Sequence, residues 1–450
     1  MAADDIWATT ALGQWIRKDF QNTSIKFIKL PANLEILDYT WLKSLGGCYT
    51  ITLPSTLQLI TKVASISNYD PETSVADTTN SLSGSDFNFQ SIVNKSSHIS
   101  ISNYSAVYTT DEANPVVETA DGLVVKSSTL VGITKHTRKV VIPASINTIS
   151  TTAFKGLPEL WEVDFSNSSV STISRDTFSS CTGLQKLTLG TSISSFYDNF
   201  ANCLAFKELV YLGTLSQFLG ISTDYNTYPC SNGTETIISV NGEEVRGTLT
   251  IPTERNRING MFRGYRLINE IYIHSSVSGY SSGALEMPFL ERVYVASGAS
   301  VPSPNRYTVM YLESTDTSKY ATIDHINYDN GHSESQLKRF YVPTGYTPIR
   351  VDGFELVTAN TADLSSGNCY IVGYFGTNSN ITIPNTFVYQ DKTYTPIGIG
   401  GYCFYNDGLL KKYRPITSAD TGPIQYIYQY SFYYCSKLTQ FTFGLGFKRM

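Results

Sequence analysis

The sequence predicts a mainly β solenoid with short helical turns, in which coils of about 22–24 residues stack along one axis. Three observations predict this fold class. An apolar pattern recurs at fixed offsets, proline-containing strand phrases recur at a similar spacing, and the composition favours strands and turns. Because a single coil of this kind cannot bury its own apolar face, successive coils must stack, and their strands then form a parallel ladder.

The repeated pattern begins with Phe and continues with apolar residues at offsets of 3, 6, 9 and 11. It is clearest in TFSSCTGLQKLTL, residues 177–189, and in SFYYCSKLTQFTF, residues 431–443. Three consecutive copies begin 24 and then 22 residues apart, at Phe154, Phe178 and Phe200. We interpret the recurring positions as scaffold; they include Phe154, Leu160, Phe178, Cys181, Leu184, Leu187, Leu189, Phe200, Cys203, Phe432, Cys435 and Leu438.

The strand of each coil is predicted from alternation and from proline. In LQKLTL the alternation of Leu187 and Leu189 indicates a short strand with one face directed inward. Strand phrases that end in proline occur at residues 140–149 (VVIPASINTI), 249–258 (LTIPTERNRI) and 381–387 (ITIPNTF). Proline prevents the chain from continuing as the same strand, and the apolar spacing of three in AFKGLPEL indicates a turn of 3₁₀ or α helix.

The cysteines are interpreted as part of the scaffold. Seven cysteines are present, at 48, 181, 203, 230, 369, 403 and 435; their odd number and the absence of a C-x-x-C pair argue against a disulfide framework and a zinc ribbon. Cys181, Cys203 and Cys435 take the place that Leu157 has in its coil, so we expect small buried apolar residues. The alternative, a ladder of stacked thiols that binds a metal, is disfavoured because no His or acidic residue repeats with them.

Composition limits the classes of function. Charged residues are only 16% of the chain, the net charge is -5 and the pI is about 5.6, so no electrostatic argument supports nucleic-acid binding. The N-terminus MAADDIWATT lacks the basic region and apolar core of a secretory signal peptide. No stretch reaches the roughly 18 apolar residues that would span a bilayer. We therefore expect a soluble chain made in a cytoplasm, without membrane insertion.

Several of these segments resemble a known family. GLPELWEVDF, SSCTGLQKLTL and YYCSKLTQFTF, each led by Phe, resemble the BspA-type leucine-rich repeat, whose usual form is A-F-x-x-C-x-x-L-x-x-I-x-I-P. Residues 238–252 and 381–404 resemble its β-hairpin variants, a form typical of Bacteroidetes and of the crAss-like phages that infect them. The resemblance implies a leucine-rich-repeat solenoid over roughly two-thirds of the chain. The family includes bacterial surface adhesins.

The pattern divides the chain into repeat blocks and interruptions. The N-terminal segment, residues 1–24, carries apolar residues that either cap the open end of the solenoid or dock it onto a larger assembly: Trp7, Trp15, Ile16 and Phe20. The two insertions are rich in Ser, Asn, Thr and Tyr, and form either loops or contact surfaces. The predicted divisions are a helical cap or docking segment at 1–24, N-terminal repeats at 25–60, an insertion at 61–117, the main array at 118–300, an insertion at 301–352 and C-terminal repeats at 353–450.

No arrangement of residues in the sequence indicates catalysis. Asp324, His325, Asp329 and His332 lie close together, but a polar surface loop explains them better than a metal site. The phrase GYSSG, with Ser281, lacks the strand-turn-helix frame and the partner base of a nucleophile elbow. We therefore predict no catalytic residue, no cofactor and no metal, unless the insertions form a composite site.

The resemblance and the composition together suggest a role in binding. The main expectation is a non-enzymatic structural or binding component of a phage virion, such as a fibre, tail or capsid-attached protein, that contacts the host surface. The alternative is a BspA-like adhesin on a bacterial cell surface. In the first case the partners are other virion proteins and a host surface protein or glycan, and the chain forms a homo-oligomer or part of a large assembly. The expected location is the virion, or alternatively the bacterial cell surface.

Overall fold

The computed structural model confirms a solenoid that is almost entirely β. The chain divides into two compact units, residues 1–212 with 231–234 and residues 213–230 with 235–450. The predicted docking residues Trp7, Trp15, Ile16 and Phe20 lie outside the described residues, as do Asp324, His325, Asp329 and His332. The structure describes residues 28, 30–38, 50–62, 77–83, 89, 91–102, 107–109, 115–134, 137–230, 235–304, 308–319, 339–358, 367–404 and 415–448.

The first unit begins with short strands that pair mainly in parallel. The sheet orders are β1-β3-β4, β2-β6-β8, β5-β7 and β13-β11-β10-β9. The strands are β1 (Ile36–Asp38), β2 (Thr50–Leu53), β3 (Leu59–Lys62), β4 (Asp77–Thr79), β5 (Ser81–Ser83), β6 (Ser91–Asn94), β7 (Ser100–Ser102), β8 (Val107–Thr109), β9 (Val116–Glu118), β10 (Leu123–Lys126), β11 (Thr129–Ile133) and β13 (Thr148–Ile149).

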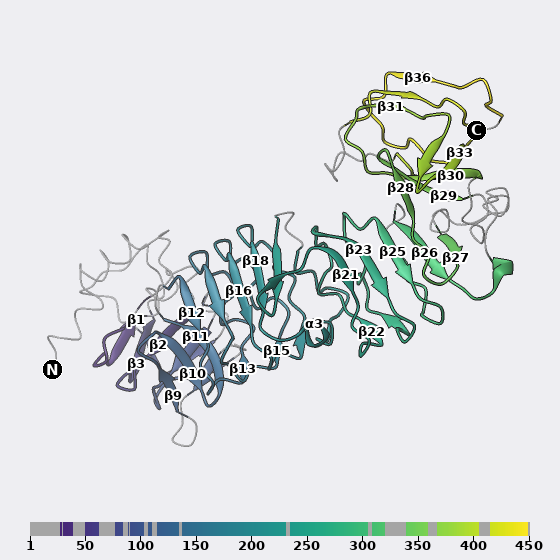
Figure 1. Cartoon of the computed structure of the whole chain (residues 1–450). Helices are drawn as coiled ribbons and strands as arrows, with labels where there is room; N and C mark the ends of the chain where they lie inside the picture. Colours follow the sequence, from purple (N-terminus) through teal and green to yellow (C-terminus); the bar gives the residue numbers. More distant parts are fainter. Residues whose placement is uncertain are drawn as a thin grey trace. The chain divides into compact units, whose positions relative to one another are not determined.

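The main ladder of the first unit consists of parallel strands from consecutive coils (Figure 1). Lys139, Glu162, Lys186 and Glu208 are register partners along it, and the short strands β15 and β17 pair on another side of the coils. The strands are β12 (Lys139–Val141), β14 (Glu162–Asp164), β16 (Lys186–Leu189), β18 (Glu208–Tyr211), β15 (Thr172–Ile173) and β17 (Ser195–Phe196).

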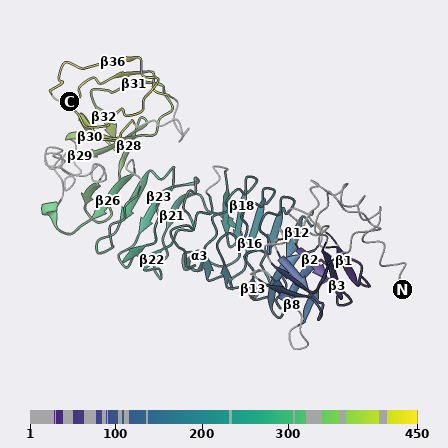
Figure 2. The ribbon, with the colours of Figure 1, turned by 180° about the vertical axis from the view of Figure 1, so that it is seen from behind.

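The second unit contains another parallel ladder, β21-β23-β25-β26-β27, which Figure 2 shows from behind. The smaller pair β22-β24 repeats the arrangement of β15-β17. The elements are α3 (Leu215–Phe218), β19 (Ile237–Val240), β20 (Glu243–Glu244), β21 (Gly247–Thr250), β22 (Arg257–Ile258), β23 (Ile268–Ile273), β24 (Gly279–Tyr280), β25 (Arg292–Val295), β26 (Val309–Glu313), the 3₁₀ turn η2 (Thr317–Lys319) and β27 (Arg339–Val342).

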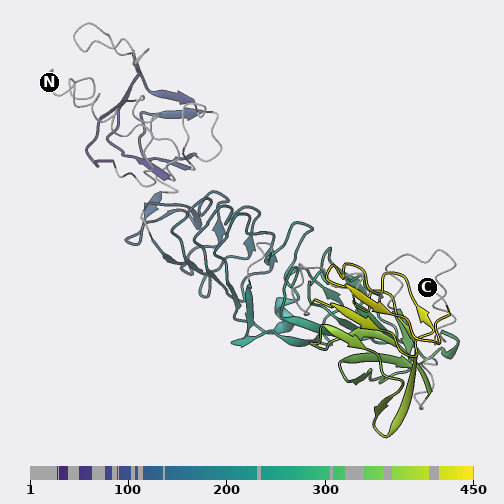
Figure 3. The same cartoon turned by 90° about the horizontal axis from the view of Figure 1, so that it is seen from above.

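A mixed sheet follows the second ladder and packs against it. Tyr370 and Val372 of this sheet share a core with Tyr294 and Tyr311 of the ladder. Figure 3 shows this end of the chain from above, with the strands of the sheet in green. The strands of the mixed sheet are β28 (Ile349–Val351), β29 (Phe354–Thr358), β30 (Gly367–Tyr374), β32 (Phe387–Tyr389), β33 (Lys392–Ile399) and β35 (Tyr426–Ile427). A separate parallel sheet consists of β31 (Asn380–Thr382), β34 (Ser418–Asp420) and β36 (Gln440–Thr442).

Parallel pairing extends into both segments that the sequence pattern marks as insertions. Strand β6, within 61–117, pairs with β2 before this segment and with β8 inside it. Strands β26 and β27 continue the second ladder within 301–352. These strands keep the ladder although their coils lack the Phe, Cys and Leu positions. Backbone pairing and an inward apolar side chain, such as Ile92 or Met310, are sufficient to add a strand.

No helix in the described part of the chain is long and apolar enough to cross a membrane.

Candidate binding surface

The scaffold positions predicted from the repeat lie in the core. Phe154, Phe178 and Phe200 stack in sequence, with ring centroids 5.4 and 5.9 Å apart. The three positions of the last coil are only half-buried. The fully buried positions are Phe154, Leu160, Phe178, Cys181, Leu184, Leu187, Leu189, Phe200 and Cys203, and the half-buried ones are Phe432, Cys435 and Leu438.

The scaffold cysteines also form hydrogen bonds between coils. The Sγ atom of Cys181 donates to the carbonyl of Phe154 at 2.8 Å, and Cys203 donates to Phe178 at 2.9 Å. Burial raises the pKa of the Cys181 thiol to about 12, so the thiol stays protonated and can donate. Within the described residues no three His, Cys, Asp or Glu side chains are placed to hold a metal ion. The thiols of Cys181 and Cys203 thus pack in the apolar core and also donate hydrogen bonds between coils.

A buried carboxylate links two coils of the first unit. Asp198 accepts hydrogen bonds from the backbone N–H of Phe178 at 3.0 Å and of Phe200 at 2.7 Å. Burial raises its pKa to about 6, against the opposing effect of these donors. Its place two residues before a scaffold Phe could have marked it, but the sequence analysis did not single it out. Asp198 fixes the turn and lies in the core, so it does not offer a surface for a ligand.

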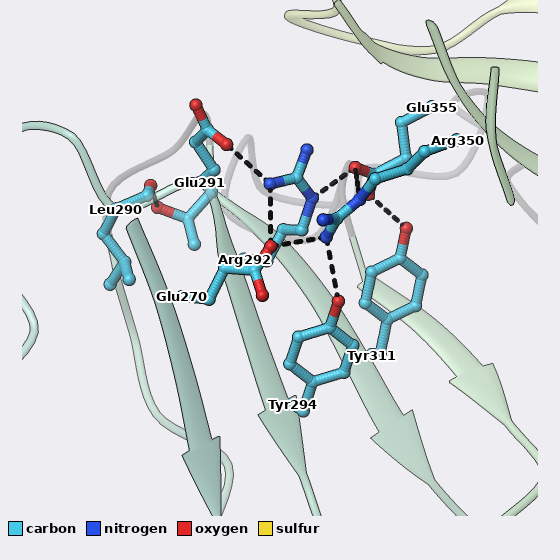
Figure 4. Close-up of polar contacts among 9 residues, drawn as sticks. Glu270, Leu290, Glu291, Arg292, Tyr294, Tyr311, Arg350 and Glu355 are labelled. Atoms are coloured by element: carbon cyan, nitrogen blue, oxygen red, sulfur yellow. Dashed lines mark hydrogen bonds and ion pairs between the residues drawn. The ribbon is translucent and has the colours of Figure 1, made fainter. Parts of the chain in front are cut away.

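A larger charged cluster lies in the second unit, between its ladder and the sheet that follows (Figure 4). Arg292 on β25 donates to Glu270 at 3.1 Å and to Glu291 at 2.5 Å, and it also pairs with Glu355 on β29. Arg350 on β28 donates to Glu270 at 2.5 Å and also pairs with Glu355.

Two tyrosine hydroxyls also form hydrogen bonds with the charged residues of the cluster. Tyr311 donates to Glu355 at 2.5 Å, and Tyr294 accepts from Arg350 at 3.2 Å. Burial and the adjacent Glu355 raise the pKa of Tyr311 well above its ordinary value, so its hydroxyl remains a donor. Every guanidinium and carboxylate of the cluster is engaged by another member. We interpret the cluster as the polar part of the contact between sheet and ladder.

Sequence analysis did not identify this cluster. Its members, tyrosines included, come from five strands and a loop, and Glu270 and Glu355 are far apart along the chain. No local motif joins them, and the cluster forms because β28 and β29 pack against β23 and β25.

The open sheet face of the first unit is a different kind of surface. Lys139 pairs with Glu162 at 2.9 Å, and Lys186 pairs with Glu208 at 3.0 Å, all partly or fully exposed. Trp161, which precedes Glu162 in the chain, is 42% exposed. The guanidinium of Arg138 lies over its ring, 4.3 Å from the ring centroid. An exposed Trp beside a charged row is a candidate contact point for a partner.

Among the described residues, a group of aromatic rings with two exposed members lies on the last coils of the second unit. Tyr402 is buried and stacks on Tyr430 at 5.0 Å, Tyr430 contacts Tyr433 at 5.2 Å, and Tyr433 contacts Tyr434 at 4.5 Å. Tyr433 is 39% exposed and Tyr434 is 58% exposed. We call Tyr402, Tyr430, Tyr433 and Tyr434 the tyrosine patch. Its exposed rings are held in place by the ring buried beneath them.

The backbone of the tyrosine patch adopts an unusual conformation. Tyr402, Tyr430 and Tyr434 have φ angles of 53°, 61° and 59°, in the left-handed region. A side chain other than Gly, Asn or Asp costs roughly 1–2 kcal/mol there. At the position of Tyr434, two residues after the scaffold Phe, three other coils place residues that fit better: Gly156 (φ 74°), Asn202 (61°) and Gly264 (77°). A further coil has Ser180 there, with a φ of 61°.

The rings of Tyr433 and Tyr434 are therefore not required by the turn. Asn202 holds the same turn with the same φ angle, and the thiol that follows forms the same bond, Cys203 to Phe178 at 2.9 Å and Cys435 to Phe404 at 3.0 Å. Conformational strain that a fold does not need is typical of positions selected for function. Sequence analysis noted Tyr only in the composition of the two insertions. Comparing FYYC at 432–435 with FANC at 200–203 would have identified the patch.

Comparison with protein families identifies the repeats. Residues 132–223 and 375–450 match the BspA type leucine rich repeat region in six copies. These parts of the chain are BspA-type leucine-rich repeats, as the resemblance implied. A comparison with curated protein sequences found no match.

Two solved structures are similar to the chain. One is a leucine rich cell surface protein from Faecalibacterium prausnitzii A2-165, with 14% identity and a TM-score of 0.30 over 74% of this chain and 76% of that one. The other is a leucine-rich repeat protein from Bacteroides ovatus ATCC 8483, with 10% identity and a TM-score of 0.27 over 95% of this chain and 69% of that one.

Proposed function

We propose that the chain is a non-enzymatic binding protein that acts at a surface, either that of a phage particle or that of a bacterial cell. One observation carries the proposal. The repeat scaffold buries its own apolar positions, yet it presents large aromatic rings where the coils do not need them, at Tyr433 and Tyr434 and at Trp161. Exposed Tyr and Trp supply contact area at a small cost in conformational entropy. A stack of coils supports such rings rigidly over an extended surface.

Binding without catalysis is supported by the state of the polar groups. The thiols of Cys181 and Cys435 have pKa values raised to about 12 and about 11 by burial, which disfavours the nucleophilic thiolate. The carboxylates of the charged cluster are engaged by arginines and tyrosines, so they are poorly placed to accept a proton from a substrate.

A direct measurement can identify where the protein acts. We expect the native protein in purified virions at a constant copy number, as the resemblance to repeats in crAss-like phages suggests. The alternative is the bacterial surface, as for BspA-like adhesins. Quantitative mass spectrometry of purified virions and of peptides released by brief proteolysis of intact cells separates the two. Absence from both fractions would refute a surface role.

Binding itself is tested with the purified full chain. The fluorescently labelled protein should attach to Bacteroides cells, and replacement of Trp161 or of the Tyr433 and Tyr434 pair by smaller residues should reduce attachment. A control is Lys186→Gln, which changes a partly exposed residue of the same ladder and removes no aromatic ring. If all variants attach as the original protein does, neither surface is the binding site.

A further inference from the structure

We propose that the tyrosine patch binds an uncharged glycan. This inference rests on the proposed function, because it names the class of ligand for one of the exposed aromatic surfaces. Three features of the patch carry it: the charge of its surroundings, the arrangement of its rings and the independence of these rings from the fold.

The two chain segments that carry the patch are uncharged. Residues 422–436, which contain Tyr430, Tyr433 and Tyr434, include no Asp, Glu, Lys, Arg or His, and neither do residues 393–404, which contain Tyr402. Side chains of these two segments cannot form an ion pair that would compensate the desolvation of an ionic ligand, so the segments are complementary to a neutral one.

The rings suit a ligand that is apolar on one side and polar at its edge. Tyr433 and Tyr434 meet at an interplanar angle of 70°, and so do Tyr430 and Tyr433, so the patch presents ring faces in different orientations. Each ring combines an apolar face with a hydroxyl at its rim. A pyranose has the matching character, because one face carries C–H groups and its edge carries hydroxyls. A neutral sugar can therefore lie on a ring face while its hydroxyls bond to tyrosine hydroxyls.

The patch is rigid before any ligand arrives. The buried ring of Tyr402 stacks on Tyr430 and contacts Tyr433 at 6.3 Å. The positive φ angle of Tyr434 fixes the direction of its side chain relative to the coil. A preorganised aromatic surface loses less entropy on binding than mobile side chains would, which favours even a weak neutral ligand.

The chain itself provides the test variant. Tyr433→Ala with Tyr434→Asn converts the turn FYYC into FANC, the sequence that this chain already folds at 200–203 with a φ of 61° at Asn202. The variant removes both exposed rings and places at 434 a residue suited to the left-handed conformation. The control is Tyr225→Ser, because Tyr225 is 65% exposed in the same unit and is not part of the patch.

The first measurement uses affinity electrophoresis of the full chain through gels that contain dextran, mannan, galactan or, as a charged probe, alginate. We expect at least one neutral polysaccharide to retard the original protein and Tyr225→Ser equally. The retardation of the double variant in the same gel should be roughly tenfold smaller. Its midpoint of thermal unfolding should stay the same or rise, because strain is relieved. Three results would overturn the inference: retardation by alginate alone, no retardation by any polysaccharide, or equal retardation of the double variant.

The second measurement separates glycans from proteins as partners. Attachment of the labelled chain to Bacteroides cells should be lost after mild periodate oxidation of cell-surface sugars and should survive proteinase K treatment. The reverse pattern would assign the patch a protein partner and overturn the inference. Failure to attach to any cell, together with retardation by a neutral polysaccharide, would refute the proposed surface role but leave the glycan site supported. A fall in unfolding midpoint of the double variant would instead indicate that the rings serve the fold.

Discussion

The two units bury carboxylates in opposite ways. In the first, Asp198 lies in the core and its bonds come from backbone N–H groups, with its pKa raised to about 6. In the second, Glu355 is fully buried and is held by two guanidinium groups and a tyrosine hydroxyl. The difference shows what each carboxylate is for. A lone acid that accepts backbone bonds shapes one turn, whereas a paired acid joins two sheets.

The sheet faces of the two ladders differ in whether another sheet covers them. On the first, Lys139, Glu162, Lys186 and Glu208 form exposed pairs along the strands. On the second, a mixed sheet covers the corresponding face, and aromatic rings pack in the contact. Because water is excluded there, each buried charge must be paired with another charge within the contact. One repeat pattern therefore supports both an open face and a covered one, and the outward residues of each strand decide which.

The largest effect is expected from breaking the charged cluster. Glu355→Ala removes the acceptor shared by Arg292, Arg350 and Tyr311 and leaves two guanidinium groups less compensated. The free energy of unfolding of this contact should fall by about 3–5 kcal/mol. Hydrogen exchange of residues 349–358 and 292–295 in the full chain measures it.

The control for this change is Glu286→Ala, which removes an exposed acid paired with Arg263 at 2.9 Å in the same unit. Its effect should be well below that of Glu355→Ala. If both substitutions change exchange equally, the cluster does not join the sheet to the ladder.

A smaller effect, which depends on pH, is expected at Asp198. The pKa of its carboxyl is about 6 in the folded chain and has an ordinary value of 3.8, so between these values the folded chain binds more protons than the unfolded one. The first unit should therefore gain stability as pH falls from 7 to 4, by about 3 kcal/mol at most from this group. Asp198→Asn should flatten this dependence.

The measurement at Asp198 is local hydrogen exchange of residues 196–203 at several pH values, corrected for the intrinsic exchange rate. The control is Asp121→Asn, which removes an exposed acid of the same unit. A pH dependence that survives Asp198→Asn would assign it to another group.

The scaffold could be predicted from the sequence because its determinants are local. A Phe, a Cys or Leu and the alternating strand residues recur at fixed offsets, so identical side chains stack coil on coil, as Phe154, Phe178 and Phe200 do. The charged cluster depends on a sheet that folds back onto the ladder, and no short pattern records that contact. The tyrosine patch lies between these cases, because its strain is visible only when the turn conformation is known.

The smallest effect is expected on the open face of the first unit. Lys186→Gln removes the cation of an exposed pair with Glu208, 3.0 Å apart. The free energy of unfolding should change by no more than about 0.5 kcal/mol, because water screens the pair and ordering two long side chains offsets its attraction. Chemical denaturation at low and high salt measures this, and the small difference should vanish at high salt. A loss as large as that of Glu355→Ala would mean that the open face is covered in solution, and that the contrast between the two ladders is one of partner rather than of exposure.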